Sequence, residues 1–413
     1  MIKLNKNKIL YPPAPGVERV LREMDTDRFR LYPDPAAEEL TGCLAEYYGV
    51  DRDQVFVGVG SDDVLSMCFL TFFNSGKPVL FPDITYSFYK VWAGLYKIPY
   101  ETPALDEQFR IVKEDYYREN GGIIFPNPNA PTAIYEELDF IEDILEHNRD
   151  SIVIVDEAYI DFAGRSALEL IDRYDNLIVT QTFSKARSMA GMRIGYAISN
   201  PELIRCLNDV KYSFNSYTMN QTAIACGVEA VRDKEYFEEH VRKIIETREW
   251  AKEELHRLGF EFPDAKANFI FATHPQTDAG RLFEALKAND IYVRHWDSER
   301  IGQYLRITVG TREEMQVLFD FLTKYIEIEN KLLSAFDNSQ NVFYTYQKVG
   351  EEMTSKMLRE RLYKNKELCL SAIKEYEQPN YWDKCEVICR HIIGSIKDKP
   401  FSISLQINGN FEN

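Results

Sequence analysis

Short apolar runs alternate with helix-like segments from about residue 55 to residue 215. Apolar residues recur with helical spacing in stretches such as SDDVLSMCFLTFF and EELDFIEDILEHN. Short strands that are apolar on both faces and alternate with amphipathic helices form parallel sheets covered by helices. This part of the chain therefore predicts an α/β fold whose large domain has a mainly parallel sheet between helices. The predicted strands are QVFVGV, PVLFP, GGIIFPNP, SIVIVDEAY and LIVTQTF.

The pattern changes after about residue 235 and predicts a smaller α+β domain. A long amphipathic helix is expected in KEYFEEHVRKIIETREWAKEELHRLGF, followed by short strands in NFIFATH, IYVRHW and YLRITVG and by two more helices. From about residue 333 onward an extra and mostly helical C-terminal extension is expected, without an assigned function, and the stretch DNSQN within it is typical of a linker. The expected boundaries are an N-terminal arm over 1–31, the large domain over 32–235, the small domain over 236–332 and the extension over 333–413.

Composition and charge narrow the function classes. The 413 residues exceed one small core, and 45% hydrophobic with 28% charged residues is typical of a soluble globular enzyme. A net charge of −17 argues against nucleic acid or an anionic membrane surface as the main partner, although a local pocket can still be positive. No apolar stretch reaches the roughly 20 residues of a membrane span, and MIKLNKNKILYPPAPG lacks the apolar core of a signal peptide. We therefore expect a cytoplasmic protein.

The seven cysteines are scattered, as reduced thiols are, and show no disulfide framework. Cys385 and Cys389 lie four residues apart with His391 close by. This spacing suits either a metal site or one face of a helix. The helix face is the preferred interpretation because small apolar thiols are commonly buried, so no metal ligand is assigned.

Polar residues follow the predicted strand ends. Gly60, Ser61 and Asp62 come after the first strand and open a helix, whose free N–H groups suit a phosphate. A simple helix cap explains Ser61 better when that stretch is taken alone. Asp156 ends an apolar strand, so its carboxylate needs a cationic partner such as a pyridinium, although a helix cap is an equal alternative. Tyr159, three residues further on, can reach the same ligand.

Lys185 follows Ser184 at the end of the last apolar strand, and Arg193 lies eight residues further on. An amine among apolar walls is a nucleophile toward aldehydes, and an arginine suits a phosphate dianion. A solvated loop charge is the simpler interpretation of Lys185 by itself. Together, however, the amine, the carboxylate and the phosphate cradle match the aldehyde, ring nitrogen and phosphate of pyridoxal phosphate.

Five blocks occur in the order seen in one known family: RLYPDP, VGVGSDDV, DEAYIDF, SKARSMAGMRIGY and LRITVGTREE. Over about residues 1–332 the chain resembles the histidinol-phosphate aminotransferases, which are fold-type I pyridoxal-phosphate aminotransferases. The resemblance implies a homodimer with pyridoxal 5'-phosphate as cofactor. It also implies that Lys185 binds the cofactor covalently, that Asp156 faces the pyridine nitrogen and that Tyr159 donates to the ring hydroxyl.

The resemblance assigns further contacts. The alternative interpretation of Tyr86 is a core tyrosine, and that of Arg306 and Arg294 is an exposed arginine on a strand. Tyr86 would stack on the pyridine ring, and Tyr32 would reach the phosphate in the neighbouring subunit's site. The implied phosphate ligands are Ser184, Arg193 and the Gly60–Asp62 backbone. The implied substrate contacts are Arg306 for a carboxylate, Arg294 for a phosphate, and Tyr11.

Two blocks depart from the family's pattern. The family's NENPYGP is NKILYPP here, so that Lys8, Ile9 and Leu10 replace Glu, Asn and Pro. The family's NPNNPTG is NPNAPTA, and Ala130 stands where an asparagine normally meets the ring hydroxyl. Either Asn129 takes that place after a small backbone shift, or the contact is lost.

The predicted function is transfer of the amine of L-histidinol phosphate to a 2-oxo-acid, 2-oxoglutarate, in histidine biosynthesis. A decarboxylase acting on an amino-acid phosphate such as threonine phosphate, and an aminotransferase for another amino acid, remain as alternatives. The altered N-terminal block and the extra tail also allow an interaction protein on an aminotransferase scaffold. Retention of Lys185, Asp156, Tyr159, Arg193 and Arg306 weighs against that last alternative.

Overall fold

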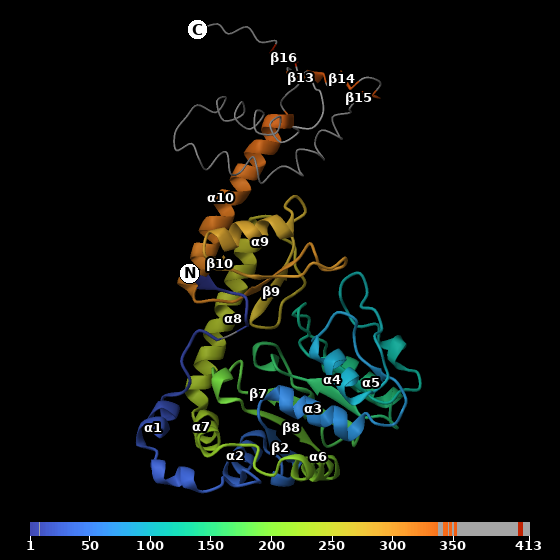
Figure 1. The fold of residues 1–413 in the computed structure, drawn as a ribbon, viewed down its shortest axis with the longest axis vertical. Coiled ribbons are helices and arrows are strands. Elements are labelled where there is room, and N and C mark those ends of the chain that lie inside the picture. The colour runs from blue at the N-terminus through green and yellow to red at the C-terminus, as the bar shows by residue number, and fades with distance from the viewer. Residues whose placement is uncertain (8, 338–341, 346, 349–350, 353–403, 408–413) are drawn as a thin grey trace. The chain divides into compact units, whose positions relative to one another are not determined.

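The computed structural model describes residues 1–7, 9–337, 342–345, 347–348, 351–352 and 404–407 (Figure 1). Met1–Leu322 form one compact unit and Thr323–Asn413 a second. Beyond helix α10 (Arg312–Asp337), the described residues form the strands β13 (Val342–Thr345), β14 (Gln347–Lys348), β15 (Glu351–Glu352) and β16 (Ser404–Ile407). The expected helices of the extension, residues 338–341 of the linker, and Cys385, Cys389 and His391 lie outside the described residues.

A seven-stranded sheet forms the centre of the first unit, in the order β2-β8-β7-β6-β5-β3-β4. Strands β7, β6, β5, β3 and β4 run parallel, and β8 runs antiparallel to both of its neighbours. All five predicted strands are present, so the mainly parallel α/β architecture is confirmed. The strands are β2 (Val55–Gly58), β3 (Val79–Leu80), β4 (Tyr100–Glu101), β5 (Ile123–Pro126), β6 (Val153–Asp156), β7 (Leu177–Thr182) and β8 (Gly195–Ser199).

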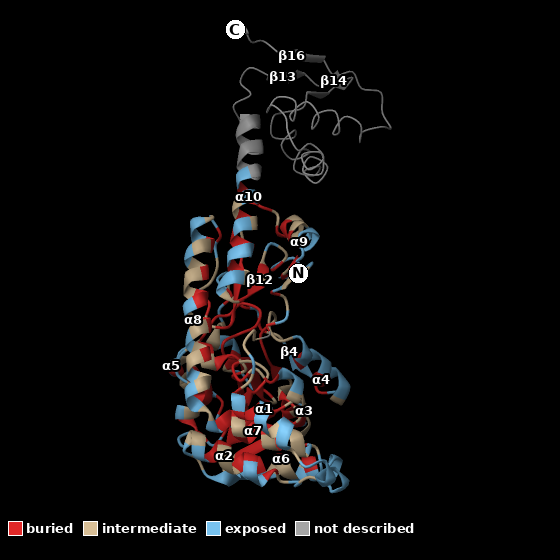
Figure 2. Cartoon of the chain, turned by 90° about the vertical axis from the view of Figure 1, so that its left-hand side faces the viewer, coloured by how far each residue is buried: buried red, intermediate tan, exposed pale blue. Residues whose placement is uncertain are grey.

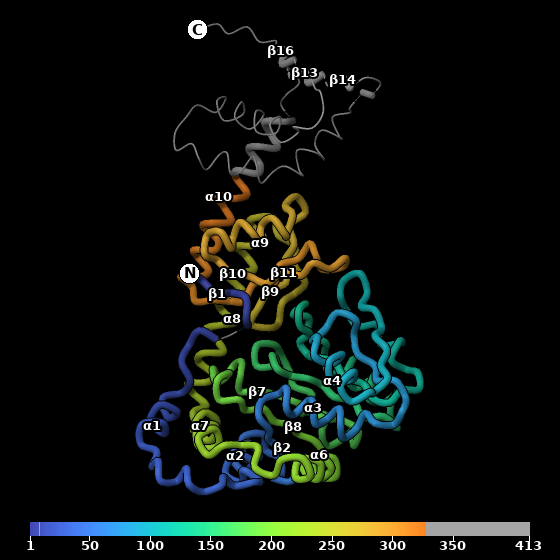
Figure 3. Tube along the Cα trace, viewed as in Figure 1, coloured from blue at the N-terminus to red at the C-terminus, as the bar shows by residue number. Residues whose placement is uncertain are grey.

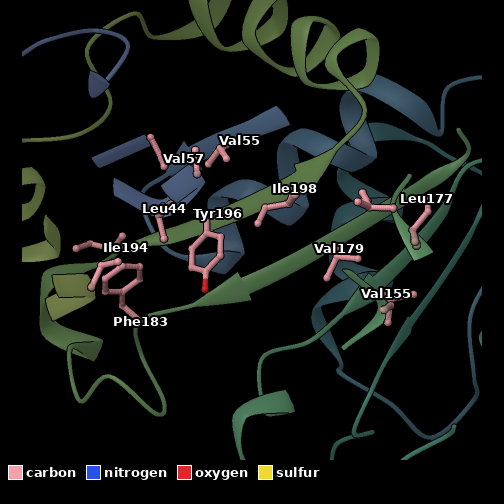
Figure 4. Packing of buried hydrophobic residues seen from close by; sticks show 14 of the residues in the cluster. Leu44, Val55, Val57, Val155, Leu177, Val179, Phe183, Ile194, Tyr196 and Ile198 are labelled. Carbon is pink, nitrogen blue, oxygen red and sulfur yellow. The ribbon is translucent and has the colours of Figure 1, made fainter. Parts of the chain in front are cut away.

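Apart from the exposed edge strand β4, the strands of the sheet are buried on both faces. Successive side chains alternate between the two faces, and an apolar cluster covers each face. On one face, Val155 and Val179 pack with Leu44 and with residues of β2 and β8 (Figure 4). On the other, Ile154 and Ile178 pack against a separate apolar cluster under α3, α4 and α6. The helices of the first unit carry buried residues on their inner faces and exposed residues outside (Figure 2). They are α1 (Pro15–Glu23), α2 (Glu38–Tyr48), α3 (Ser61–Phe72), α4 (Phe88–Tyr96), α5 (Leu138–His147), α6 (Pro201–Phe214), α7 (Gln221–Arg232), α8 (Lys234–Arg257) and α9 (Ala279–Ala288), with 3-10 turns at Thr26–Arg30, Arg52–Gln54, Lys113–Tyr116, Ile160–Phe162, Ala167–Leu170 and Ala190–Met192.

A smaller antiparallel sheet has the order β11-β12-β9, from β9 (Phe269–Ala272), β11 (Arg294–His295) and β12 (Leu305–Thr308). The run IYVRHW, expected as one strand, forms two: β10 (Ile291–Tyr292) pairs with β1 (Ile2–Lys3), and β11 pairs with β12. The register of that second pair places Arg294 directly opposite Arg306.

The N-terminal arm runs from the smaller sheet to the helices of the larger one (Figure 3). Strand β1 joins β10, and the Leu4 carbonyl accepts a hydrogen bond from the Thr308 amide at 2.9 Å. Further along, α1 packs on α7. In the described part of the chain, no helix has both the length and the apolar character needed to cross a bilayer.

Candidate active site

The predicted strand-end residues share one edge of the seven-stranded sheet. Strands β5, β6 and β7 are parallel, with Pro126 opposite Asp156 and Asp156 opposite Thr180. Their carboxyl ends therefore meet at the edge where ligands of open α/β sheets bind. Lys185 follows the end of β7 by three residues, and the β2–α3 turn at Gly60 lies at the end of a strand with the same direction.

Asp156 is a buried carboxylate, 5% exposed, and accepts hydrogen bonds from two protein groups. The Tyr89 hydroxyl donates to its Oδ2 at 2.8 Å, and the Ala158 amide to its Oδ1 at 3.3 Å. Burial raises the pKa of Asp156 to about 6, against these hydrogen bonds and the charge of Lys185, which lower it. Asp156 does not cap a helix, because the next helical turn, Ile160–Phe162, is preceded by Tyr159. A buried carboxylate with this raised pKa needs a cation such as a pyridinium.

Lys185 and Tyr159 lie beside this carboxylate. The Lys185 Nζ is 5.3 Å from the centroid of the Tyr159 ring. The Tyr159 hydroxyl accepts a hydrogen bond from Asn7 Nδ2 at 3.0 Å, so its own hydrogen remains for another acceptor. Asn7 and Tyr89 are site residues that sequence reasoning missed. The signal for Asn7 was the retained first asparagine of NKILYPP, whereas Tyr89 gives no local signal.

A cradle for an anion lies at the N-terminus of α3. Gly60 has φ +87°, and a Cβ there would come within 2.5 Å of the Arg193 guanidinium. A Cβ on Gly195 would lie 2.4 Å from the Ser61 amide nitrogen. These two glycines let Arg193 and strand β8 approach the free amides of the helix end, which bind phosphate well. Arg193 has φ 54°, a left-handed conformation that is costly for a non-glycine residue and common at functional sites.

Ser61 is the first residue of α3 and follows the N-cap Gly60, so the helix-cap explanation of Ser61 is wrong.

The Asp62 carboxylate lies between two partners: Arg193 at 3.2 Å and the Tyr86 hydroxyl, which donates at 2.7 Å. Tyr86 is half-buried and lies edge-on against Tyr89, the partner of the buried carboxylate. Ser184 is also half-buried, and its amide donates to Thr182 Oγ1 at 3.1 Å.

These observations test whether pyridoxal phosphate fits the residues present. The site offers an amine, a buried carboxylate that forms no ion pair within the described residues, and a helix end where Gly60 leaves room for the Arg193 guanidinium. Each meets one polar part of the cofactor: aldehyde, ring nitrogen and phosphate. The residues therefore fit the group.

The missing asparagine is not replaced by its neighbour. Asn129 donates both amide hydrogens to the protein, to the Ile84 carbonyl at 3.1 Å and to Thr132 Oγ1 at 3.0 Å, and its Oδ1 accepts from Thr85 at 2.9 Å. No amide hydrogen of Asn129 is left to donate to a ring hydroxyl. In this conformation the structure therefore does not support Asn129 as the replacement for the asparagine expected at Ala130.

The two expected substrate arginines lie together on the smaller sheet. Arg306 donates from one guanidinium nitrogen to the Asn5 carbonyl at 3.1 Å, but its buried Nε has no hydrogen-bond partner. Burial lowers the pKa of Arg306, Tyr159 raises it, and the facing charge of Arg294 lowers it further. Both guanidinium carbons lie near Trp296, which sequence reasoning missed. The pair forms a positive site with an unsatisfied buried donor, which suits an anion.

Tyr11 and Tyr32, the two remaining tyrosines expected at the site, contact other aromatic side chains of the protein. Tyr11 lies edge-on against His240, with ring centroids 4.8 Å apart. Tyr32 is 81% exposed and stacks on Tyr217 at 4.8 Å. Within the described residues, no group of three or more His, Cys, Asp or Glu side chains is placed to hold a metal ion.

Comparisons with known proteins show which family this chain resembles. The family model "Aminotransferase class I and II" matches residues 1–322. The histidinol-phosphate aminotransferase of Pseudomonas putida (strain W619) is 53% identical over 323 residues, which are 78% of this chain and 93% of that protein. The one of Lactococcus lactis subsp. cremoris (strain MG1363) is 50% identical over 331 residues, which are 80% and 93% of the two chains.

A solved structure shares the fold. Histidinol-phosphate aminotransferase from Sinorhizobium meliloti, in complex with pyridoxal-5'-phosphate, has a TM-score of 0.72 at 23% identity, covering 79% of this chain and 91% of that one. The expected fold-type I architecture is thereby confirmed. The family model and the two relatives of about half identity place the chain among the class I and II aminotransferases, in the histidinol-phosphate aminotransferase family.

Proposed function

We propose that this enzyme transfers the amine of L-histidinol phosphate to 2-oxoglutarate. Its class works with pyridoxal phosphate, and the site residues fit that cofactor. The observation that carries the substrate is the arginine pair: Arg306 has a buried Nε without a partner and lies directly opposite Arg294. Two adjacent guanidinium groups suit a dianion better than a single carboxylate. The names of the relatives at 53% and 50% identity support the same substrate.

Lys185, Asp156 and Tyr159 would perform the proton and charge work. Bound pyridoxal phosphate supplies an aldehyde carbon for the substrate's amine and a ring that withdraws electrons from the carbon bearing it. Lys185 Nζ would hold the cofactor and would act as the general base for the proton on that substrate carbon. The Asp156 carboxylate would keep the ring nitrogen protonated. The Tyr159 hydroxyl would donate its remaining hydrogen to the ring oxygen.

The phosphate of the cofactor would lie in the cradle at α3. Its proposed ligands are the amides of Ser61 and Asp62, the Ser184 hydroxyl and the Arg193 guanidinium. The turn at Gly60 makes room for the guanidinium, since a Cβ at this position would lie only 2.5 Å from it. Tyr86 would cover the ring from the side of α4.

Tyr32 would complete the site of a second subunit, which makes the enzyme a homodimer. The segment that carries Tyr32 exposes Phe29 (54%) and Leu31 (54%), and Phe214 nearby is 77% exposed. Gln221 bonds to the Leu31 carbonyl at 3.0 Å, so these apolar residues belong to one surface with Tyr217. Exposed apolar surface of this kind marks protein interfaces.

Both substrates would use Arg306. The phosphate of the first substrate engages both arginines, whereas the carboxylate of glutamate or 2-oxoglutarate engages Arg306, because a guanidinium fork pairs with either anion. Tyr11, on the N-terminal arm, would line the entrance.

A half-reaction tests this proposal. Holoenzyme is mixed with L-histidinol phosphate alone, and the visible absorbance of the cofactor is followed. The absorbance should fall and return when 2-oxoglutarate is added, with one glutamate formed per cycle. L-histidinol, which lacks the phosphate, should react at least about tenfold more slowly, since it loses charge-assisted hydrogen bonds of about 1.5–3 kcal/mol.

Two results would change the assignment. Failure of L-histidinol phosphate to react, with another amine reacting, would refute the substrate but leave the aminotransferase class in place. Release of carbon dioxide from O-phospho-L-threonine without any oxo-acid would favour the decarboxylase alternative.

A further inference from the structure

The indole of Trp296 lies against both substrate arginines. Its ring centroid is 5.2 Å from the guanidinium carbon of Arg294 and 5.3 Å from that of Arg306. Both distances are within the roughly 6 Å range of cation–π attraction, for which tryptophan is the best ring. Trp296 is itself supported by Phe271, at 6.4 Å between ring centroids and an interplanar angle of 67°.

The arginines need such a partner because they repel each other. Arg294 and Arg306 are directly opposite on β11 and β12, and like charges at such a position disfavour the pairing. An aromatic ring attracts both guanidinium groups at once. This attraction uses no N–H donor, so the donors, including the unpartnered Nε of Arg306, remain available for an anion.

The arginine that Trp296 contacts is connected to the reacting amine by packed rings. Arg306 lies 5.3 Å from the Phe269 ring, and Phe269 packs edge-on against Tyr159 at 5.1 Å. Lys185 Nζ is 5.3 Å from that same Tyr159 ring. The position of the Arg306 guanidinium therefore decides where a bound anion lies relative to Lys185.

We propose that Trp296 is a positioning residue that gives the site its preference for a phosphate dianion, by holding Arg294 and Arg306 together on one anion. This inference rests on the proposed function. A carboxylate needs Arg306 alone, and the Arg306 guanidinium also lies over the ring of Phe269. A phosphate dianion uses both arginines and therefore depends on the shared indole.

The test compares Trp296→Leu, which removes the ring, with Trp296→Phe, which keeps a smaller one. Holoenzyme is used, so that the cofactor's own phosphate cradle is filled. With Trp296→Leu, KM for L-histidinol phosphate and Kd for inorganic phosphate, measured by calorimetry, should rise about tenfold, the size expected for two partly desolvated cation–π contacts. The kcat, and KM for glutamate, should stay within about twofold on the same reasoning. Trp296→Phe should recover most of the loss.

The matched control is Tyr304→Leu. Tyr304 belongs to the same apolar cluster, and its ring stacks on Phe271 at 4.4 Å. If Trp296 were only a packing residue, both leucine variants would change the two substrates alike, and that result would overturn the inference. A selective loss in Trp296→Leu alone supports it. Should Trp296→Leu fail to fold, the same comparison is made with Trp296→Phe, where the weaker ring should still raise Kd for phosphate about two- to threefold.

The two proposals can fail separately. If wild-type enzyme does not react with L-histidinol phosphate, the substrate proposal is refuted, while weaker phosphate binding in Trp296→Leu still supports the role of the indole. If wild-type enzyme reacts and phosphate binding is unchanged in Trp296→Leu, the inference about Trp296 is wrong and the substrate proposal is unaffected.

Discussion

The buried carboxylate of Asp156 should make the cofactor-free protein less stable at neutral pH. Its pKa is raised from the ordinary 3.8 to about 6 by burial. The folded state therefore binds the proton more tightly than the unfolded state. The stability that comes from protonated Asp156 is fully present below the unfolded pKa and is lost as the pH rises through 6. The difference of about two pKa units corresponds to about 3 kcal/mol above pH 7.

Asp156→Asn removes that charge without changing the shape of the side chain. The amide oxygen can still accept from Tyr89, but the NH₂ group does not accept the bond from the Ala158 amide, at a cost of about 1 kcal/mol. We expect the cofactor-free variant to be about 2 kcal/mol more stable than wild type at pH 8 and no more stable at pH 4. For a chain of this length that is a rise in Tm of about 2 °C at pH 8.

With the cofactor bound, the order of stability should change in favour of wild type. A pyridinium beside Asp156 would give the carboxylate a charge partner, so the cofactor should stabilise wild type more than Asp156→Asn. Transamination by Asp156→Asn should fall by more than about a hundredfold, because a neutral amide does not keep the proton on the ring nitrogen. The measurements are thermal unfolding from pH 4 to 8.5, with and without cofactor, and single-turnover kinetics.

Glu157→Gln is the matched control. Glu157 is also buried, and burial raises its pKa to about 7, but its carboxylate accepts from Ser166, the Ala167 amide and Gln181. Its substitution should leave the stabilisation by cofactor unchanged. The reasoning fails if Asp156→Asn gives no gain at pH 8 without cofactor, or if its activity drops only a few-fold.

Four further outcomes are expected. Tyr89→Phe removes the hydroxyl that donates to the strand-end carboxylate at 2.8 Å, so the cofactor's absorbance should titrate at a shifted pH; an unchanged titration would contradict this role. Lys185→Ala should leave no lysine to which borohydride fixes the cofactor, as read by mass spectrometry, and fixation at another single lysine would show the assignment to be wrong. Arg306→Ala should lower kcat/KM more than about tenfold for both substrates, and Arg294→Ala mainly for the phosphorylated one; equal small losses in the second variant would argue against it. A chain ending after Leu333 keeps every residue of α10 that is described as buried, the last of which is Ile326, and should bind cofactor as a dimer in gel filtration; an insoluble or monomeric product would assign the tail to the fold or the dimer interface.

The apolar runs predicted the site's framework because parallel strands must end at a common edge. Asp156 and Lys185 lie close together because β6 and β7 are parallel neighbours, whereas the order of the strands in the sheet was not predicted. Strand β8 was not predicted, since Gly195–Ser199 begins at the end of the SKARSMAGMRIGY block, and its close approach to the distant Gly60 turn is a tertiary contact.

The remaining site contacts join residues that local periodicity does not connect. Asn7 and Tyr159 are 152 positions apart, and Tyr89 and Asp156 are 67 apart. Trp296 is in a run that was expected as one strand, and its contact with Arg306 depends on the pairing of β11 with β12, which the run itself does not reveal. Such contacts depend on tertiary packing, which the sequence pattern does not reveal.

The N-terminal arm joins the two sheets at one asparagine. Asn7 donates to Tyr159 beside the larger sheet, accepts from Asn268 through its carbonyl at 3.2 Å, and exchanges hydrogen bonds with Thr308 of the smaller sheet. A chain whose start is shifted past this residue would lose all of these bonds at once. For anyone producing the enzyme, the segment around Asn7 should therefore be kept intact, because it holds Tyr159 of the candidate site in place.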